Sequence, residues 1–323
     1  MVVQDYPYWP RILGQTWRTL LTVFVVSLVV VFLDRHHQAL LKQISVPDMT
    51  VTVLGAALSI LLVFRTNSAY ARWWEARTLW GALVNSSRSL ARQAVSLTEQ
   101  SADGPSATSG TTSGRTSGAT SGATSGQTFA RTLVYRQIAF AHAMRCALRR
   151  QNVLAEIQPF LDEPTISVLE KQVNIPAALL QMMGDEVAEA ANTGLLTDLR
   201  LQRMDGTLTD LTNILGGCER IKNTPLPRQY DFYPELFIKF YCIVLPIIIV
   251  DDVKLFTPVV TLLVSFVFLV LNRIGKNLED PFENRPYDVQ LTALSRTIEI
   301  NLRQALGETE LPPAVQPVHG VLW

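Results

Sequence analysis

The sequence predicts an all-α integral membrane protein in which four transmembrane helices carry a large cytoplasmic helical region. Of the 323 residues, 48% are hydrophobic and only 17% are charged, whereas soluble proteins carry a charged share of roughly 25%. Four long apolar runs explain the shortage of charge. In addition, no segment shows the strict alternation of apolar and polar residues that is typical of a half-buried strand.

The four apolar runs contain no charged residue and are the predicted membrane spans. A helix that crosses a bilayer needs about 20 apolar residues, so each run needs aromatic or basic residues at its ends to reach both interfaces. Buried core helices of a soluble protein are the alternative, but four such runs exceed what a soluble core needs. The runs are residues 19–33, 49–64, 240–250 and 255–271, and the flanking residues are Trp9, Trp17, Tyr233, Phe237 and Lys239.

Basic residues beside the spans predict the orientation, because cytoplasmic loops carry an excess of Lys and Arg. The two outer connections, residues 34–48 and 251–254, hold few of them, and the segments on the other side hold many. The first group is Arg35, Lys42 and Lys254, and the second is Arg11, Arg18, Arg65, Arg72, Arg77, Lys222, Arg228, Lys239, Arg273, Lys276 and Arg285. We therefore expect both termini and the stretch from Arg65 to Lys239 to be cytoplasmic, in a multi-pass protein of the cell's inner membrane.

The second apolar run is predicted to continue as one helix from about Met49 to about Leu97, because apolar residues recur at helical spacing beyond its end. Residues 99–128 form a low-complexity insert in which Thr-Ser-Gly recurs every four residues. Such a composition cannot bury a core and behaves as a flexible, disordered linker. The predicted regions are the first two spans with the long helix (1–98), the insert (99–128), a cytoplasmic helical region (129–230), the third and fourth spans (231–274) and a cytoplasmic C-terminal segment (275–323).

Helical periodicity resumes after the insert. Pro176 favours the start of a helix, and Gly216 and Gly217 are expected to end the helix that precedes them. After the fourth span, Pro281 interrupts the chain ahead of a last amphipathic helix. The predicted cytoplasmic helices are residues 129–148, 151–161, 166–173, 177–194, 197–216 and 288–306.

The sequence indicates neither an enzyme nor a cofactor. It lacks the glycine-rich phosphate loops, the HExxH zinc motif and the GxSxG nucleophile motif. The 28 basic and 28 acidic residues cancel, so no excess of charge points to nucleic acid. Three separated cysteines fit a reducing interior. Adjacent His36 and His37 point to different faces of a helix and therefore suit a shared metal ion poorly, so no metal site is expected. His142 is expected to be a surface or packing residue.

The second span has a face on which Ala56, Ile60 and Phe64 lie four residues apart, continued by Ser68. Ordinary helix packing explains such a stripe, and a pore wall is the alternative. Because one helix cannot enclose a pore, conduction needs several chains that each give one copy of this helix. The cytoplasmic end carries a collar typical of an interfacial aromatic belt with salt bridges, which consists of Asn67, Ser68, Arg72, Trp73, Trp74 and Glu75.

Three segments agree in order and in position relative to the spans with those of a known family. They are FRTNSAYARWWEARTLWGALVNSSRSLARQ (Phe64 to Gln93), LGGCERIKNTPLP (Leu215 to Pro227) and NLEDPFENRPYDVQL (Asn277 to Leu291). Together they resemble the bestrophin family, especially its prokaryotic and plant branch, over almost the whole chain except the insert. The resemblance implies a homopentamer in membrane lipid, with a central pore lined by the second span.

The resemblance also implies the site residues. The family's hydrophobic neck falls on Ala56, Ile60 and Phe64, with Ala56 where members usually carry a bulkier residue. The second constriction, the cytoplasmic aperture, falls near Leu201 and Gln202. A neck without charges or carbonyls discriminates by the cost of dehydration and gates by dewetting. We therefore expect passive conduction of chloride and other small monovalent anions.

One departure concerns calcium. The residues after the last span that correspond to an acidic calcium clasp include Glu283, Asn284, Arg285 and Asp288. Calcium takes six to eight oxygen ligands, which this run does not supply, so no calcium gating is expected here. Three alternatives stay open: a monovalent-cation channel of the same fold, a non-conducting membrane scaffold, and a small transporter.

Overall fold

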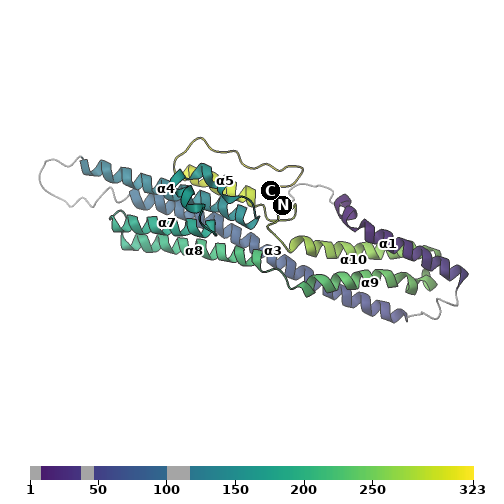
Figure 1. Ribbon diagram of the computed structural model, residues 1–323. Helices are drawn as coiled ribbons and strands as arrows, with labels where there is room; N and C mark the ends of the chain where they lie inside the picture. The colour runs from purple at the N-terminus through teal and green to yellow at the C-terminus, as the bar shows by residue number, and fades with distance from the viewer. Residues whose placement is uncertain (1–8, 38–46, 100–116) are drawn as a thin grey trace. The chain divides into compact units, whose positions relative to one another are not determined.

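The structure is a computed structural model that describes residues 9–37, 47–99 and 117–323 (Figure 1). Within these ranges the secondary structure is helical, apart from one isolated bridge between Val318 and Val321. The chain divides into two compact units. The first unit contains the described residues up to Trp74 together with 224–281, and the second contains the described part of 75–223 together with 282–323.

The first unit consists of long apolar helices. It contains α1 (Trp9–His36), the first part of α3 (Asp48–Glu99), α9 (Arg228–Val253) and α10 (Thr257–Leu278). Helix α1 packs against both α9 and α10, which also pack against each other (Figure 1). The core joins all four helices and consists of Val23, Leu58, Leu62, Ile238, Tyr241, Cys242, Leu245 and Leu269.

Helices α9 and α10 form a hairpin, as the sequence predicts. Helix α9 ends at Val253, and Lys254 then adopts a positive φ of 49°. A single 3-10 turn, Lys254–Phe256, leads into α10, where Pro258 occupies the first turn. Proline is tolerated there because the first backbone N–H groups of a helix have no intrahelical partner.

Three stretches of the described residues are long and apolar enough to cross a membrane: Leu13–His36, Met49–Leu97 and Arg228–Leu278. The third stretch contains both α9 and α10 with the turn between them. All four predicted apolar runs therefore lie in helices of the first unit, and the protein is a membrane protein.

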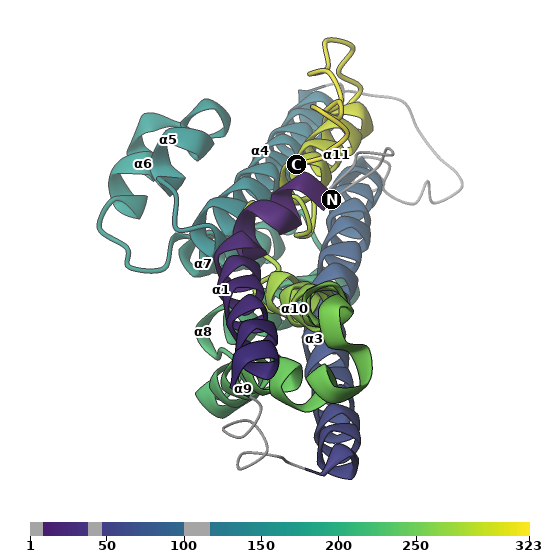
Figure 2. The same cartoon turned by 90° about the vertical axis from the view of Figure 1, so that its right-hand side faces the viewer.

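The second unit is a bundle around α4. Helix α4 (Ser117–Leu148) packs against α5 (Val153–Ile157), α7 (Ile175–Asn192) and α11 (Leu291–Ala305), and α7 packs against α8 (Asp198–Asn223) (Figures 1 and 2). The short η1 (Gln158–Phe160) and α6 (Glu163–Leu169) complete the unit together with the second part of α3. Buried α4 side chains such as Leu133, Ile138 and Met144 are inaccessible to solvent.

Several helix boundaries differ from the prediction, and the largest differences are at the start of α4 and the end of α8. Helix α4 begins at Ser117, so the last part of the predicted linker is helical, whereas residues 100–116 lie outside the described residues. A packed helix extends one backbone hydrogen bond at a time without a new nucleation cost, and the buried part of α4 supplies that nucleus. The predicted long helix from about Met49 to about Leu97 is confirmed by α3.

The prediction that Gly216 and Gly217 end a helix is wrong, because α8 continues to Asn223. The structure assigns Gly217 another role. A β-carbon at Gly217 would lie 3.0 Å from Cδ1 of Leu79 on α3. The glycine therefore permits the close approach of α8 to α3 instead of ending the helix. At Gly216 a β-carbon would meet nothing within 4 Å.

This contrast predicts different effects of one substitution at adjacent positions. Gly217→Val should lower the free energy of unfolding by about 1–3 kcal/mol, because extra methyl groups overpack the contact with Leu79. Gly216→Val, the matched control, should leave stability nearly unchanged. Thermal unfolding of the two purified variants checks this, and equal losses at both positions would contradict the assigned role of Gly217.

Candidate pore-lining site

Helix α3 has two different faces in the first unit. Leu58, Leu62, Arg65 and Ala69 are buried, with no more than 6% of any side chain exposed. The positions between them are open: Ile60 is 58% exposed and Phe64 is 63% exposed. Ala56, one turn before Ile60, is also exposed. The predicted neck residues thus share the uncovered face of α3.

The uncovered face is apolar where the neck is predicted. Val53 and Val63 flank the stripe and are also more than half exposed. None of these side chains carries a charge or a hydrogen-bonding group. Contact of this face with bulk water would cost about 25 cal/mol per Å² of apolar surface.

Gly55 allows α3 to lie close to α9. A β-carbon at Gly55 would lie 3.0 Å from the hydroxyl oxygen of Tyr241. The Ser59 hydroxyl donates a hydrogen bond of 2.8 Å to the Gly55 carbonyl oxygen, which satisfies it within the helix. Close packing on this side leaves the opposite face of α3 uncovered.

A charged cluster fixes α3 directly after Phe64. The Arg65 side chain is 2% exposed, and its guanidinium donates hydrogen bonds to Asp231 of α9 and Asn272 of α10. The carboxylate of Glu279 lies 3.9 Å from the same guanidinium. Lys276 extends the cluster, with its Nζ 3.5 Å from Asp231. The sequence reasoning missed this cluster, because its members are far apart in the chain.

The predicted collar residues lie on consecutive turns of α3. Asn67 is exposed, and the half-buried Ser68 hydroxyl donates a 2.9 Å hydrogen bond to the Phe64 carbonyl oxygen. Arg72 donates a hydrogen bond of 2.6 Å to the backbone carbonyl of Thr224. The rings of Tyr70, Trp73 and Trp74 lie 6.2–6.5 Å apart, in agreement with an aromatic belt.

Glu75, the last collar residue, belongs to the second unit and pairs with Arg220 of α8. The predicted aperture residues also lie on α8, where Leu201 is half-buried and Gln202 is exposed. The neighbouring Arg200 donates a 2.7 Å hydrogen bond to the carbonyl oxygen of Leu97 and so joins the first turn of α8 to α3.

A buried ionic network in the second unit surrounds His142. The ring is 1% exposed, with Nε2 3.2 Å from Glu299 and Nδ1 3.5 Å from Glu156. Arg145 pairs with Glu156, and Arg296 lies 2.9 Å from Glu299. His142 is therefore not a surface residue but a buried link between α4, α5 and α11.

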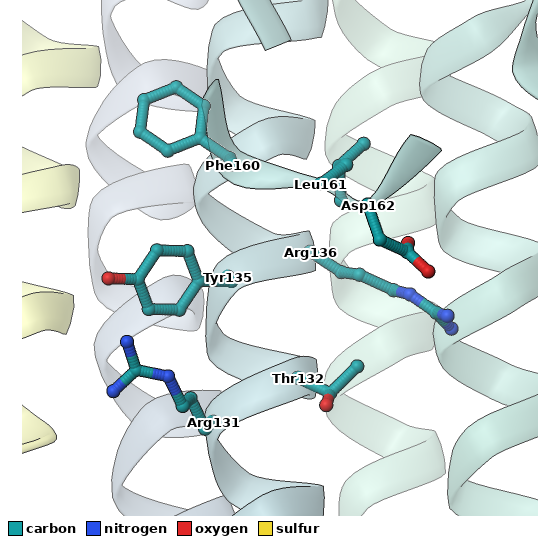
Figure 3. Close-up of a pocket in the computed structure, with 7 residues that line it drawn as sticks. All are labelled: Arg131, Thr132, Tyr135, Arg136, Phe160, Leu161 and Asp162. Carbon is teal, nitrogen blue, oxygen red and sulfur yellow. The ribbon is translucent and has the colours of Figure 1, made fainter. Parts of the chain in front are cut away.

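A pocket of about 380 Å³ opens beside this network (Figure 3). Arg131 and Tyr135 lie on one side of it, where the Tyr135 hydroxyl donates a 2.7 Å hydrogen bond to Glu308. On the other side, Arg136 pairs at 3.1 Å with Glu186, whose pKa burial raises to about 7. The two arginines that line the pocket are thus paired with neighbouring carboxylates, Arg131 with Glu308 at 3.5 Å and Arg136 with Glu186.

The segment that contains Glu283, Arg285 and Asp288, where no calcium site is expected, is held by hydrogen bonds and an ion pair. Asp288 accepts a 2.9 Å hydrogen bond from the backbone N–H of Arg285, and burial raises the pKa of Asp288 to about 6. Glu283 pairs with Lys222 of α8. Among the described residues, no group of three or more His, Cys, Asp and Glu side chains is arranged to hold a metal ion.

Comparisons with known proteins cover almost the whole chain. Residues 9–304 match the family described as Bacterial/Fungal Bestrophin protein. The voltage-dependent anion channel-forming protein YneE of Salmonella typhi is 31% identical over 320 residues, which is 97% of this chain and 96% of that protein. The voltage-dependent anion channel-forming protein of Ralstonia nicotianae is also 31% identical, over 96% of each chain.

Solved structures agree with this match. A bacterial bestrophin homologue from Klebsiella pneumoniae has a TM-score of 0.78 to this chain at 27% sequence identity. The superposition covers 90% of this chain and 98% of that one.

The buried position of Arg65 predicts a large stability effect. Arg65→Gln leaves Asp231 and Glu279 without their guanidinium partner. It should lower the free energy of unfolding by about 3 kcal/mol, which is the lower end of the range for a broken buried ion pair. The lower end applies because Asp231 is 38% exposed. The control is Lys239→Gln, because Lys239 is 49% exposed and pairs with Glu235 at 2.7 Å.

The control substitution should cost less than about 1 kcal/mol, as surface pairs do. Thermal unfolding of the detergent-solubilised variants measures both effects. Comparable losses for Arg65→Gln and Lys239→Gln would show that the cluster does not hold α3.

Proposed function

The chain belongs to the bacterial and fungal bestrophin family, and on that premise we propose that it is a passive anion channel whose pore is lined by α3. The family match spans residues 9–304, and relatives aligned over nearly their full length are anion channel-forming proteins. The likeness to a solved bestrophin homologue supports the same type of channel.

The observation that carries the pore assignment is the uncovered apolar face of α3. Ile60 and Phe64 are 58% and 63% exposed in one subunit, whereas Leu62 between them is 2% exposed. An apolar face that one subunit leaves open becomes a pore wall when several copies of α3 surround an axis. We propose that the assembly is a homopentamer, as the family resemblance implies.

The proposed topology has four spans, formed by α1, the first part of α3, α9 and α10. The α9–α10 turn at Lys254 lies on the outer side, together with the connection between α1 and α3. Both termini and the second unit then lie in the cytoplasm of a cell whose inner membrane holds the protein. The excess of Arg and Lys on that side supports this orientation.

Conduction through this neck depends on dehydration. Rings of Ile60 and Phe64 offer an ion neither charge nor carbonyl oxygen, so a weakly hydrated anion crosses more easily than a strongly hydrated one. Ala56 is smaller and makes the outer end of the neck wider. Beyond the neck, a ring of Gln202 with Leu201 beside it would form a polar second aperture.

The neck assignment is tested by planar-bilayer recording of the purified protein. Ile60→Ala and Phe64→Ala should each raise the single-channel conductance at least about twofold, because they widen and hydrate the constriction. Phe240→Ala is the control, since Phe240 on α9 is 58% exposed but lies outside the neck.

The control should conduct like the unaltered protein. An unchanged conductance in both α3 variants would contradict the neck assignment. An unaltered protein that carries no current under any voltage or salt gradient would contradict the channel itself and favour a membrane scaffold.

A further inference from the structure

An exposed ion pair lies further along the helix that carries the neck. Glu75 of α3 and Arg220 of α8 form a side-chain hydrogen bond, with the two side chains 46% and 65% exposed. Exposed pairs of this kind contribute little to stability, about 0–1 kcal/mol. The pair is therefore not required to hold the fold.

The spacing along α3 places Glu75 on the same face as the neck. Phe64 and Glu75 are separated by 11 positions of one uninterrupted helix. At 3.6 residues per turn, this spacing returns the side chain to within about 20° of Phe64 and about 16 Å further along the axis. If Phe64 faces the pore, Glu75 faces it as well.

The neighbouring charges point elsewhere. Glu219 precedes Arg220 on α8 and is turned by about 100° from it, and its carboxylate accepts a 2.7 Å hydrogen bond from Asn174. Lys222 pairs with Glu283, and Arg72 binds the carbonyl oxygen of Thr224. Of these charges, those of Glu75 and Arg220 are therefore the nearest to the face that carries Phe64.

We propose that the Glu75–Arg220 pair sets which sign of ion the channel prefers, an inference that rests on the proposed pore along α3. The apolar neck carries no formal charge with which to select the sign of an ion. At its cytoplasmic mouth, Arg220 attracts small monovalent anions, and Glu75 partly neutralises Arg220 so that the anion is released. Removal of Arg220 leaves a ring of unpaired negative charge from Glu75, and removal of Glu75 leaves a ring of unpaired positive charge from Arg220.

Reversal potentials in asymmetric KCl test this balance. Arg220→Gln should lower the ratio of chloride to potassium permeability about fivefold, and Glu75→Gln should raise it by a similar factor, as one unpaired charge near the ion path predicts. Both changes should shrink when the same KCl gradient is set up with the dilute bath at about 1 M, where the Debye length is about 3 Å.

Two further variants control for misfolding and for general surface charge. The exchanged pair Glu75→Arg with Arg220→Glu restores the charge balance and should restore the permeability ratio of the unaltered channel. Arg131→Gln removes one charge of matched exposure, 64%, from the same unit and should leave the ratio unchanged. Size-exclusion chromatography verifies that each variant keeps the oligomer of the unaltered protein.

The outcomes separate the two proposals. If the channel conducts but neither Glu75→Gln nor Arg220→Gln changes the permeability ratio, the pair has no role in selectivity and the pore proposal stands. If the Arg131→Gln control shifts the ratio as much as Arg220→Gln does, the effect is general surface charge, which also overturns the assignment. A protein without current overturns the pore and this inference together.

Discussion

The constraint on which the pore face depends is the buried guanidinium of Arg65. A charge that is 2% exposed must be paired, since an unpaired buried charge costs several kcal/mol. Its partners, Asp231 and Asn272, come from α9 and α10. Because they lie on one side of α3, they fix the rotation of that helix about its axis. Phe64 precedes Arg65 and is turned by about 100° from it, towards the uncovered face.

Because α3 is long, the constraint at Arg65 affects more of the chain than the residues beside it. The helix runs without a break from Asp48 to Glu99 and contributes residues to both units. Once Arg65 fixes its rotation, helical spacing fixes the direction of each side chain along it, from Ile60 in the proposed neck to Glu75 at the end of the collar. The positions of Arg65, of the apolar stripe that contains Ile60 and Phe64, and of Glu75 around the α3 axis are thus fixed together by helical spacing.

The sequence predicts the features that depend on local pattern. Apolar runs and helical spacing give the four helices of the first unit and the unbroken α3, and short motifs indicate the family. Features that depend on distant partners are hidden from such reasoning. Arg65 and Asn272 are 207 positions apart, and neither has a periodic signal. Gly217 fits a helix stop by type, but only the contact with Leu79 explains it. Whether Ile60 faces water depends on neighbouring subunits.

Thiol accessibility tests most directly the central claim that the uncovered face of α3 lines a water-filled path. The three native cysteines are replaced by serine, and single cysteines are placed at Ile60 and, as the lipid-facing control, at Leu263 of α10, which is 65% exposed. A charged, membrane-impermeant thiol reagent should react at position 60 and block the current, and it should leave position 263 unmodified. Reaction at neither position, with current intact, would contradict the account.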